Sequence, residues 1–394
     1  MRSTHAYLLF TATLLTALGY GATFLMTEHF RTLGGSEIET GKTLIGAMLG
    51  TLIGVPLVGW FAGRLGAARM ASLGALLVAS GYAIIALQTT ISPLLPLAGL
   101  FIGLGWGAFY LAAPLALSGR VTDQDRGFWF LRFGVFQMGG IGLSPIASTA
   151  LIHHLGLSTG EAFSVIAGAC AVASAMLLAF EVISPAPRAT QGTAESTAWV
   201  RALPALARSR ALFPILMVGL GASVFTGLMT FQTSLIRGTT LDAGTYFGAY
   251  AITVVGSRFF LAPTLAKADS DRMAVLLLVL MSLGVGLAFA FSVGVLVQLA
   301  SAIVLGLGYG LVYSIIQTQA VNDAPPSLRS AALTWFVIAY FVGIFGFPML
   351  GSWLIVHIGT RWFLAVALLF ALAELALALV RLAGRKKQLT PAAQ

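Results

Sequence analysis

Long apolar runs separated by short polar stretches fill the chain from about residue 6 to residue 384. A helix needs about 20 apolar residues to cross the hydrocarbon core of a bilayer. Twelve runs approach or exceed that length, at residues 6–27, 42–63, 70–88, 94–117, 129–152, 161–183, 211–234, 245–266, 273–291, 294–318, 331–355 and 362–384. The runs are rich in Leu, Ala and Gly and do not alternate with polar residues, so they predict membrane helices rather than the strands of a barrel.

The composition supports the same interpretation. Of the 394 residues, 58% are hydrophobic and only 9% are charged, whereas a soluble domain has about 25% charged residues. We therefore expect an all-α integral membrane protein with twelve transmembrane helices.

One long polar stretch interrupts the pattern. Residues 184–210 are rich in Pro, Ala, Ser, Thr and Arg and predict a linker that contains at most a short surface helix. The predicted division is an N-terminal six-helix half at 1–183, a cytoplasmic linker at 184–210, a C-terminal six-helix half at 211–384 and a cytoplasmic tail at 385–394.

The net charge of +9 does not indicate nucleic-acid binding, because no basic cluster adjoins a soluble region. Lys and Arg instead mark the loops that stay inside. With both termini inside, the inner side holds Arg2, Arg64, Arg69, Arg120, Arg126, the linker arginines, Lys267, Arg272, Arg329, Arg385, Lys386 and Lys387, and the outer side holds Arg31, Lys42, Arg237 and Arg361. This asymmetry predicts a multi-pass protein of the inner membrane with cytoplasmic termini.

The two halves are related to each other in sequence. A constant shift of 203 residues places TFLMT at 23–27 on TGLMT at 226–230, GLGWG at 103–107 on GLGYG at 306–310, and HLG at 154–156 on HIG at 357–359. Such duplication is typical of transporters that bind their substrate between two like halves. The glycines of the GLGWG and GLGYG runs are expected to serve close helix packing rather than nucleotide binding.

The duplication, the twelve helices, the middle linker and the loop between helices 2 and 3 resemble the major facilitator superfamily over essentially the whole chain. In that loop the family's glycines and basic residues are matched by Gly59, Arg64, Gly66 and Arg69. The resemblance implies a secondary transporter that works by alternating access, with this loop as a gating element. Gly63 stands where the family has an aspartate, so the two arginines require another partner, for which Asp123 and Asp125 are the candidates.

Drug-efflux members of the family often carry an arginine in helix 4, four residues before a Gly-x-Gly. Here Phe101 precedes Gly105 and Gly107. This substitution weakens the case for a proton-driven multidrug or metabolite efflux antiporter, which remains the alternative to a transporter of a small organic solute.

Charged residues inside membrane helices are costly and mark functional sites. Arg258 lies deep in helix 8, where it either binds substrate or has a structural role; Arg132, near the inner end of helix 5, serves either the substrate or a headgroup. No acid lies in the centre of helices 1, 4, 7 or 10, so these cations indicate an anionic, carboxylate-bearing solute.

Two acids are candidates for proton coupling. Glu374 lies in the middle of helix 12; because the resemblance makes that helix peripheral, a packing or partner role is the alternative. Glu28, beside His29 at the outer end of helix 1, is either a coupling group or part of a solvated helix end.

Polar and aromatic residues on the helices that the family places near the axis are candidates for lining a substrate site. Each alternatively holds neighbouring helices together. Together with the two arginines, the predicted substrate-binding residues are Tyr20, Tyr110, Gln137, Gln232, Tyr309, Tyr313, Gln317, Trp335 and Tyr340.

Other function classes have weaker support. Residues 41–43, GKT, resemble the end of a phosphate loop, but Ser36 replaces the required glycine. No catalytic His/Glu or zinc pattern and no selectivity-filter repeat is visible, which disfavours an enzyme or a channel. We expect a non-enzymatic, monomeric protein that needs no cofactor and no metal, and whose partners are a small solute, protons and the lipid bilayer.

Overall fold

A computed structural model describes residues 3–122, 125–185, 198–265 and 268–389 of the chain. Every secondary-structure element in these ranges is helical, which confirms the all-α prediction. Each of the twelve predicted segments is helical, with ends that differ by a few residues from the predicted ones. Eleven helices of the described ranges are long and apolar enough to span a membrane, and α12 (Ala243–Leu265) occupies the remaining segment.

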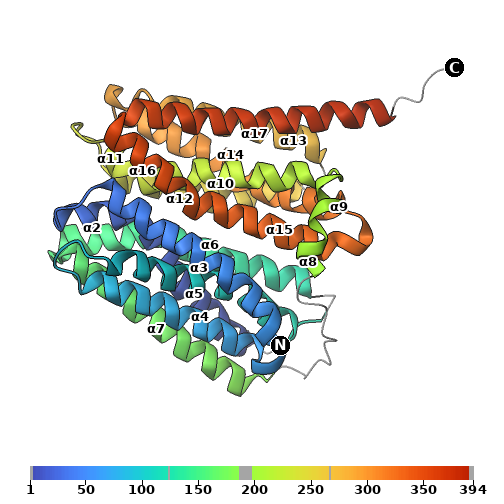
Figure 1. Cartoon of the computed structure of the whole chain (residues 1–394), viewed down its shortest axis with the longest axis horizontal. Helices are drawn as coiled ribbons and strands as arrows, with labels where there is room; N and C mark the ends of the chain where they lie inside the picture. The colour runs from blue at the N-terminus through green and yellow to red at the C-terminus, as the bar shows by residue number, and fades with distance from the viewer. Residues whose placement is uncertain (1–2, 123–124, 186–197, 266–267, 390–394) are drawn as a thin grey trace. The chain divides into compact units, whose positions relative to one another are not determined.

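The chain divides into two compact units (Figure 1). Unit 1 comprises Met1–Ser196 together with Pro348–Val356, and unit 2 comprises Thr197–Phe347 together with His357–Gln394. The first half of the sequence contributes α1 (Ser3–Gly21), η1 (Ala22–Leu25), α2 (Met26–Thr32), α3 (Glu37–Leu65), α4 (Ala67–Ala86), α5 (Leu94–Ser118), α6 (Arg126–Leu155) and α7 (Thr159–Ile183).

The second half begins with two short helices of the predicted linker. Its elements are α8 (Ala198–Arg201), α9 (Leu203–Ala207), α10 (Leu212–Thr230), α11 (Gln232–Leu235), α12, α13 (Ser270–Ala288), η2 (Phe291–Val293), α14 (Val295–Asn322), η3 (Pro326–Leu328), α15 (Arg329–Phe341), η4 (Val342–Gly346), α16 (Phe347–His357) and α17 (Thr360–Leu389).

Local sequence explains where several helices begin. Ser36 and Glu39 form a capping box at the start of α3, and Ser158 and Glu161 form another at the start of α7. In each box the serine and glutamate side chains satisfy backbone N–H groups that have no partner within the helix. The GKT sequence at 41–43 lies inside the continuous helix α3, so it forms no phosphate-binding loop.

Glycines allow the helices of unit 1 to pack at very short distances. A methyl group added to Gly99 or Gly103 of α5 would overlap the carbonyl oxygen of Thr43 or Ala47 of α3. The glycine of the GLGWG run at 105 and that of GLGYG at 308 face α4 and α13 in the same way. The packing interpretation of both runs is therefore confirmed, and small residues bring the helix backbones together as in other membrane bundles.

Helix 11 of the sequence is not one regular helix. Between α15 and α16 it contains the π-helical segment η4, and Pro348 is the second residue of α16. Proline lacks an amide hydrogen, and π segments often mark functional sites in helices. Pro145, which the shift of 203 residues places on Pro348, lies inside the uninterrupted α6, so a break accompanies only one of these two prolines.

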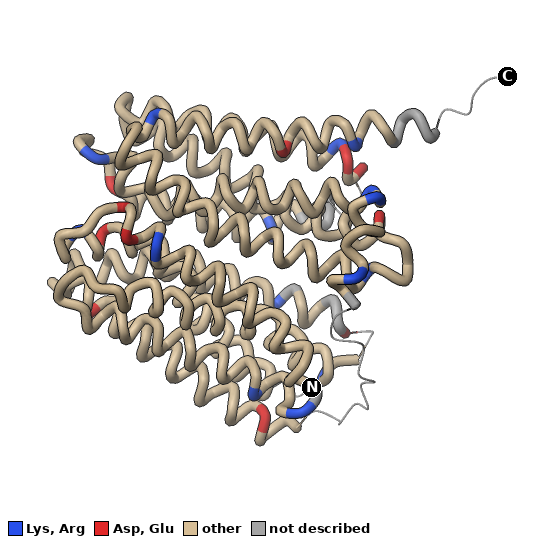
Figure 2. Tube along the Cα trace, in the orientation of Figure 1, with Lys and Arg blue, Asp and Glu red and all other residues tan. Residues whose placement is uncertain are grey.

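Most of the positions occupied by Lys, Arg, Asp and Glu in each unit lie toward the ends of the helices (Figure 2). In unit 1 the helix ends that carry Arg64, Arg69 and Arg120, and in unit 2 the helix ends that carry Asp271 and Arg381, are each called the basic end of their unit below.

Candidate functional site

A stack of aromatic rings joins α1 to α5 in unit 1. The ring of Tyr20 lies parallel to that of Trp106, with centroids 5.3 Å apart and an interplanar angle of 16°. Phe24 contacts Tyr20 edge to face, and Tyr110 lies one turn along α5 with its ring 6.2 Å from Trp106. Two predicted substrate residues, Tyr20 and Tyr110, therefore belong to one cluster centred on Trp106.

Unit 2 contains an equivalent stack. The ring of Tyr309 on α14 lies parallel to Phe225 on α10, with centroids 4.7 Å apart and an interplanar angle of 8°. The shift of 203 residues places Trp106 on Tyr309. In each unit a ring stack therefore connects the first membrane helix to the fourth. Such offset-stacked rings contribute about 0.5–1.5 kcal/mol beyond their buried area.

A second ring cluster in unit 2 joins α14 to α15. Tyr313 lies 5.2 Å from Tyr340 and 5.5 Å from Phe336, measured between ring centroids. Gln317 follows Tyr313 one turn along α14 and is partly buried. Three of the predicted substrate residues thus share one region of unit 2.

Gln232 is completely buried at the start of α11, 0% exposed. Both its amide oxygen and its amide nitrogen lack a hydrogen-bond partner among the described residues, and so does the neighbouring hydroxyl of Thr233. Gln137 on α6 is also buried, at 8% exposure. An unsatisfied buried amide is costly, so Gln232 destabilises the described conformation.

Arg258 is partly buried on α12 and lies against α14. Its Nε donates a hydrogen bond to the carbonyl oxygen of Gly310 at 2.9 Å. No carboxylate forms an ion pair with it in the described part of the chain. The backbone contact holds the guanidinium in place while its two terminal nitrogens remain able to bind an anion.

Arg132 has a different environment. Its guanidinium lies over the ring of Phe128 at 4.2 Å and near that of Trp129 at 5.9 Å, both on its own helix α6. These cation–π contacts stabilise a cation without a carboxylate.

Trp335 contacts the linker rather than another predicted substrate residue. Its Nε1 donates to the carbonyl oxygen of Trp199 at 2.8 Å, and the two indole rings meet edge to face. Ala202 and Leu206 of the linker complete a buried apolar cluster with Ala324, Ala331 and Ala332. The linker segment from Ala198 to Ala207 therefore forms part of unit 2.

The two predicted coupling acids differ in burial. Glu28 on α2 is partly exposed, whereas Glu374 in the middle of α17 is 1% exposed. The carboxyl of Glu374 lies against Gly221 of α10, and its Oε2 has no hydrogen-bond partner among the described residues.

The loop between α3 and α4 turns at Gly66, whose φ of 91° favours glycine. Gly59 lies on α3 with open space around it, and Arg64 and Arg69 are exposed. In the described ranges neither arginine forms an ion pair, and Asp125 accepts a hydrogen bond from Thr122 instead. Asp123 lies outside the described residues.

Sequence reasoning did not identify the ion pairs of the basic end. In unit 1 the guanidinium of Arg120 binds the carboxylate of Glu181 and the carbonyl oxygens of Ala116 and Ser184, and its side chain is 3% exposed. A methyl group on Gly66 would lie 3.0 Å from Glu181 Oε1. Among the described residues, an acid beside the α3–α4 loop thus comes from the end of α7.

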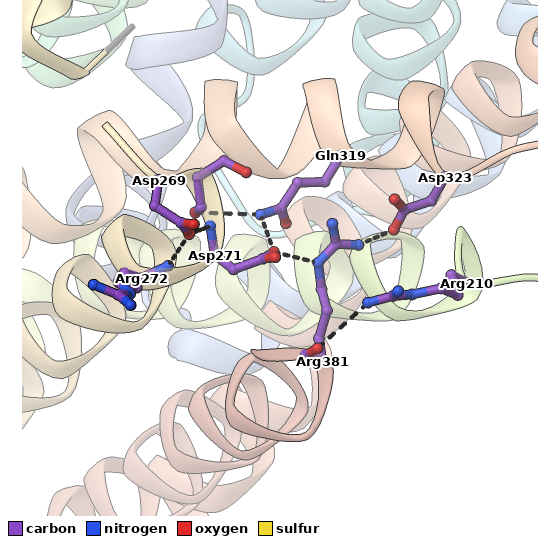
Figure 3. Close-up of polar contacts among 8 residues, drawn as sticks. Arg210, Asp269, Asp271, Arg272, Gln319, Asp323 and Arg381 are labelled. Atoms are coloured by element: carbon purple, nitrogen blue, oxygen red, sulfur yellow. Dashed lines mark hydrogen bonds and ion pairs between the residues drawn. The ribbon is translucent and has the colours of Figure 1, made fainter. Parts of the chain in front are cut away.

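In unit 2 a buried network surrounds Arg381 of α17 (Figure 3). Its Nε donates to Asp271 at 2.8 Å, and its Nη1 binds Asp323. Gln319 donates to Asp271 at 3.1 Å, and Arg210 donates to the carbonyl oxygen of Arg381. The network ties α17 to the start of α13, the end of α14 and the linker. In the sequence, the shift of 203 residues places Arg120 on Asp323. This pairing of two charged residues at equivalent positions was the feature that could have indicated both clusters.

The membrane-spanning helices and the paired aromatic clusters define a multi-pass α-helical membrane protein built from two related halves, which is the architecture of a secondary transporter. The chain belongs to the Major Facilitator Superfamily, whose family model matches residues 9–348. A comparison with curated proteins finds no match.

Solved structures share the fold over nearly the whole chain. The POT family transporter PepTSo is 14% identical with a TM-score of 0.75, and the alignment covers 99% of each chain. A nucleoside transporter, NupG, is 17% identical with a TM-score of 0.72 and coverage of 96% of this chain and 99% of that one. A peptide transporter of the POT family, in complex with sulfate, is 15% identical with a TM-score of 0.74, covering 97% and 94%. At these identities the likeness concerns the fold.

Proposed function

We propose that this protein is a secondary active transporter that moves a small organic solute with an anionic group, such as a carboxylate, across the inner membrane by alternating access, with protons as the coupling ion. It acts as a monomer with both termini in the cytoplasm, and the basic end faces the cytoplasm. The charge distribution supports this orientation, because loops rich in Lys and Arg remain inside.

The observation that best supports an anionic substrate is the environment of Arg258. A guanidinium inside a membrane helix is costly unless it has a function or a counter-charge. Arg258 has no carboxylate partner among the described residues, and a single backbone hydrogen bond to Gly310 fixes its orientation. Arginine binds a carboxylate through two parallel N–H donors, and the terminal nitrogens of Arg258 supply that pair.

The aromatic clusters of unit 2, the unit that contains Arg258, suit the rest of such a solute. Tyr309 and Tyr313 combine apolar ring faces with polar groups at their edges. Most binding sites for small molecules likewise combine apolar walls with a few placed polar groups. Gln232 adds an amide that is not satisfied in the described conformation.

The test uses purified full-length protein. A thermal-shift screen compares monocarboxylates, dicarboxylates and their uncharged amide analogues, and the stabilising compounds are then followed as radiolabelled solutes into proteoliposomes, with and without an imposed pH gradient. Arg258→Gln should lower the uptake of carboxylates at least tenfold while uptake of any transported neutral analogue persists.

Arg237→Gln is the matched control, because Arg237 is exposed outside the predicted membrane segments and should leave uptake unchanged. Equal loss of charged and neutral solutes in Arg258→Gln would refute the anion-binding role. Accumulation in everted vesicles, without uptake in right-side-out ones, would instead establish the efflux antiporter.

A further inference from the structure

Glu374 presents its side chain to the interior of unit 2. The apolar residues Leu369, Leu372, Leu379 and Val380 of the same helix, α17, are 46–62% exposed, whereas Glu374 is 1% exposed. The carboxyl therefore points away from the lipid-facing side of the helix, although helix 12 is peripheral in the expected arrangement.

Gly221 of α10 forms the surface opposite this carboxyl. A methyl group at Gly221 would lie 2.6 Å from Glu374 Oε2 and 2.9 Å from Oε1. The absence of a side chain at Gly221 thus leaves room for both oxygens of the carboxyl.

No charged group of the neighbouring helices compensates a negative charge there. Helix α17 packs against α10 and α13. Helix α10 contains no titratable residue, and the charged residues of α13 are Asp271 and Arg272 in its first turn. On α17 itself the nearest cation is Arg381, seven residues away and bound to Asp271 and Asp323; at 1.5 Å per residue it lies about 10 Å along the helix axis.

Burying an isolated carboxylate away from water costs far more free energy than burying the uncharged acid. The described packing of α10 on α17 is therefore compatible with a neutral Glu374 and incompatible with an ionised one. Separation of α10 from α17 at Gly221 would admit water, and the acid could then ionise.

We propose that Glu374 is the group that binds and releases the coupling proton, and that the contact of α10 with α17 at Gly221 controls its access to water. The inference rests on the proposed function and assigns one residue to its coupling step. In each cycle the neutral carboxylic acid gives one proton to water on one side of the membrane when the contact opens, leaving a carboxylate. That carboxylate takes up one proton from water on the opposite side, in the other conformation of the alternating-access cycle, before the helices pack again.

The protonation state can be tested without any solute. Infrared difference spectra of the full-length protein in lipid, wild type minus Glu374→Gln, should show the carbonyl stretch of a buried carboxylic acid at neutral pH. Glu28→Gln is the matched control, since it makes the same chemical change at a partly exposed acid and should leave that band unchanged. A carboxylate signal assigned to Glu374 at neutral pH would overturn the proposal.

The coupling is tested in proteoliposomes that contain a trapped pH-sensitive dye, with the radiolabelled carboxylate that emerges from the uptake screen. Wild type should move protons with the solute, and Glu374→Gln should keep solute exchange while losing at least nine-tenths of the coupled proton movement. Gly221→Ala, which places a methyl group in the space of the carboxyl, should also reduce the coupling.

The outcomes are separable. Solute flux with the same proton movement in wild type and Glu374→Gln would refute the role of Glu374 in coupling but would leave the proposed transport function intact. No solute flux in wild type would overturn the proposed function and the assignment with it.

Discussion

Arg120 and Asp323 occupy equivalent positions in the two halves and carry opposite charges. Arg120, at the end of α5, binds Glu181 near the end of α7. Asp323, 203 residues later and at the end of α14, binds Arg381 near the end of α17. Each half therefore fastens its fourth helix to its sixth at the basic end through one ion pair whose polarity is reversed. The contact is common to both repeats although the residue types are exchanged.

The unit 1 pair should be sensitive to the loss of one partner. Glu181→Ala leaves the guanidinium of Arg120, 3% exposed, without its carboxylate, which typically costs about 3–5 kcal/mol. Unfolding of the purified protein in detergent, followed by tryptophan fluorescence, measures the loss.

Lys42→Ala is the control, because Lys42 is 54% exposed in its pair with Glu39 and such surface pairs contribute about 0–1 kcal/mol. The double variant Arg120→Leu with Glu181→Leu should recover most of the stability lost in Glu181→Ala. Equal stability of Glu181→Ala and Lys42→Ala would show that the carboxylate is not needed.

The helices could be predicted from sequence because hydropathy alone determines where a segment can cross a bilayer. The choice of side-chain partners could not, since it depends on which helices are neighbours. The position of Glu374 in helix 12 was evident, but the apolar residues all around it gave no sign that it faces Gly221. Likewise Trp335 was grouped with substrate residues, although its indole N–H is bound to Trp199. The substrate roles of Trp335 and of the other aromatic residues remain predictions.

The close approach of α3 to α5 makes Gly103 intolerant of substitution. A side chain there would overlap the backbone of Ala47, so Gly103→Val must separate the two helices, and overpacking of this kind costs about 1–3 kcal/mol or more. Gly168→Ala is the control, because nothing lies near that position on α7 and alanine favours a helix by up to about 1 kcal/mol. The midpoint of thermal unfolding should fall for Gly103→Val and hold or rise for Gly168→Ala; a fall of equal size in both would contradict the packing argument.

The indole N–H of Trp335 should serve the linker. Trp335→Phe keeps an aromatic ring but removes the donor to the carbonyl oxygen of Trp199, a loss of about 0.5–1.5 kcal/mol. We expect faster limited proteolysis of the linker with unchanged solute affinity. Tyr313→Phe, which removes the hydroxyl from a ring that packs against Phe336 and Tyr340, is the control for proteolysis. A lower solute affinity with an unchanged rate of linker cleavage would contradict this expectation and indicate that Trp335 contributes to substrate binding.

Substitution of Gln232 should affect the stability of the protein and its transport activity differently. Because both of its amide atoms lack partners in the described conformation, Gln232→Leu removes two buried unsatisfied groups, each of which costs about 1–3 kcal/mol. The variant should therefore be as stable as wild type or more stable, while solute uptake falls if another conformation uses the amide to bind the solute.

Gln298→Leu is the matched control: its amide nitrogen donates to the carbonyl oxygen of Asp242 at 2.9 Å, so that variant should be less stable. Thermal unfolding and uptake by proteoliposomes measure the two effects. Reduced stability of Gln232→Leu with normal uptake would mean that the amide is satisfied within the resting protein and has no part in transport.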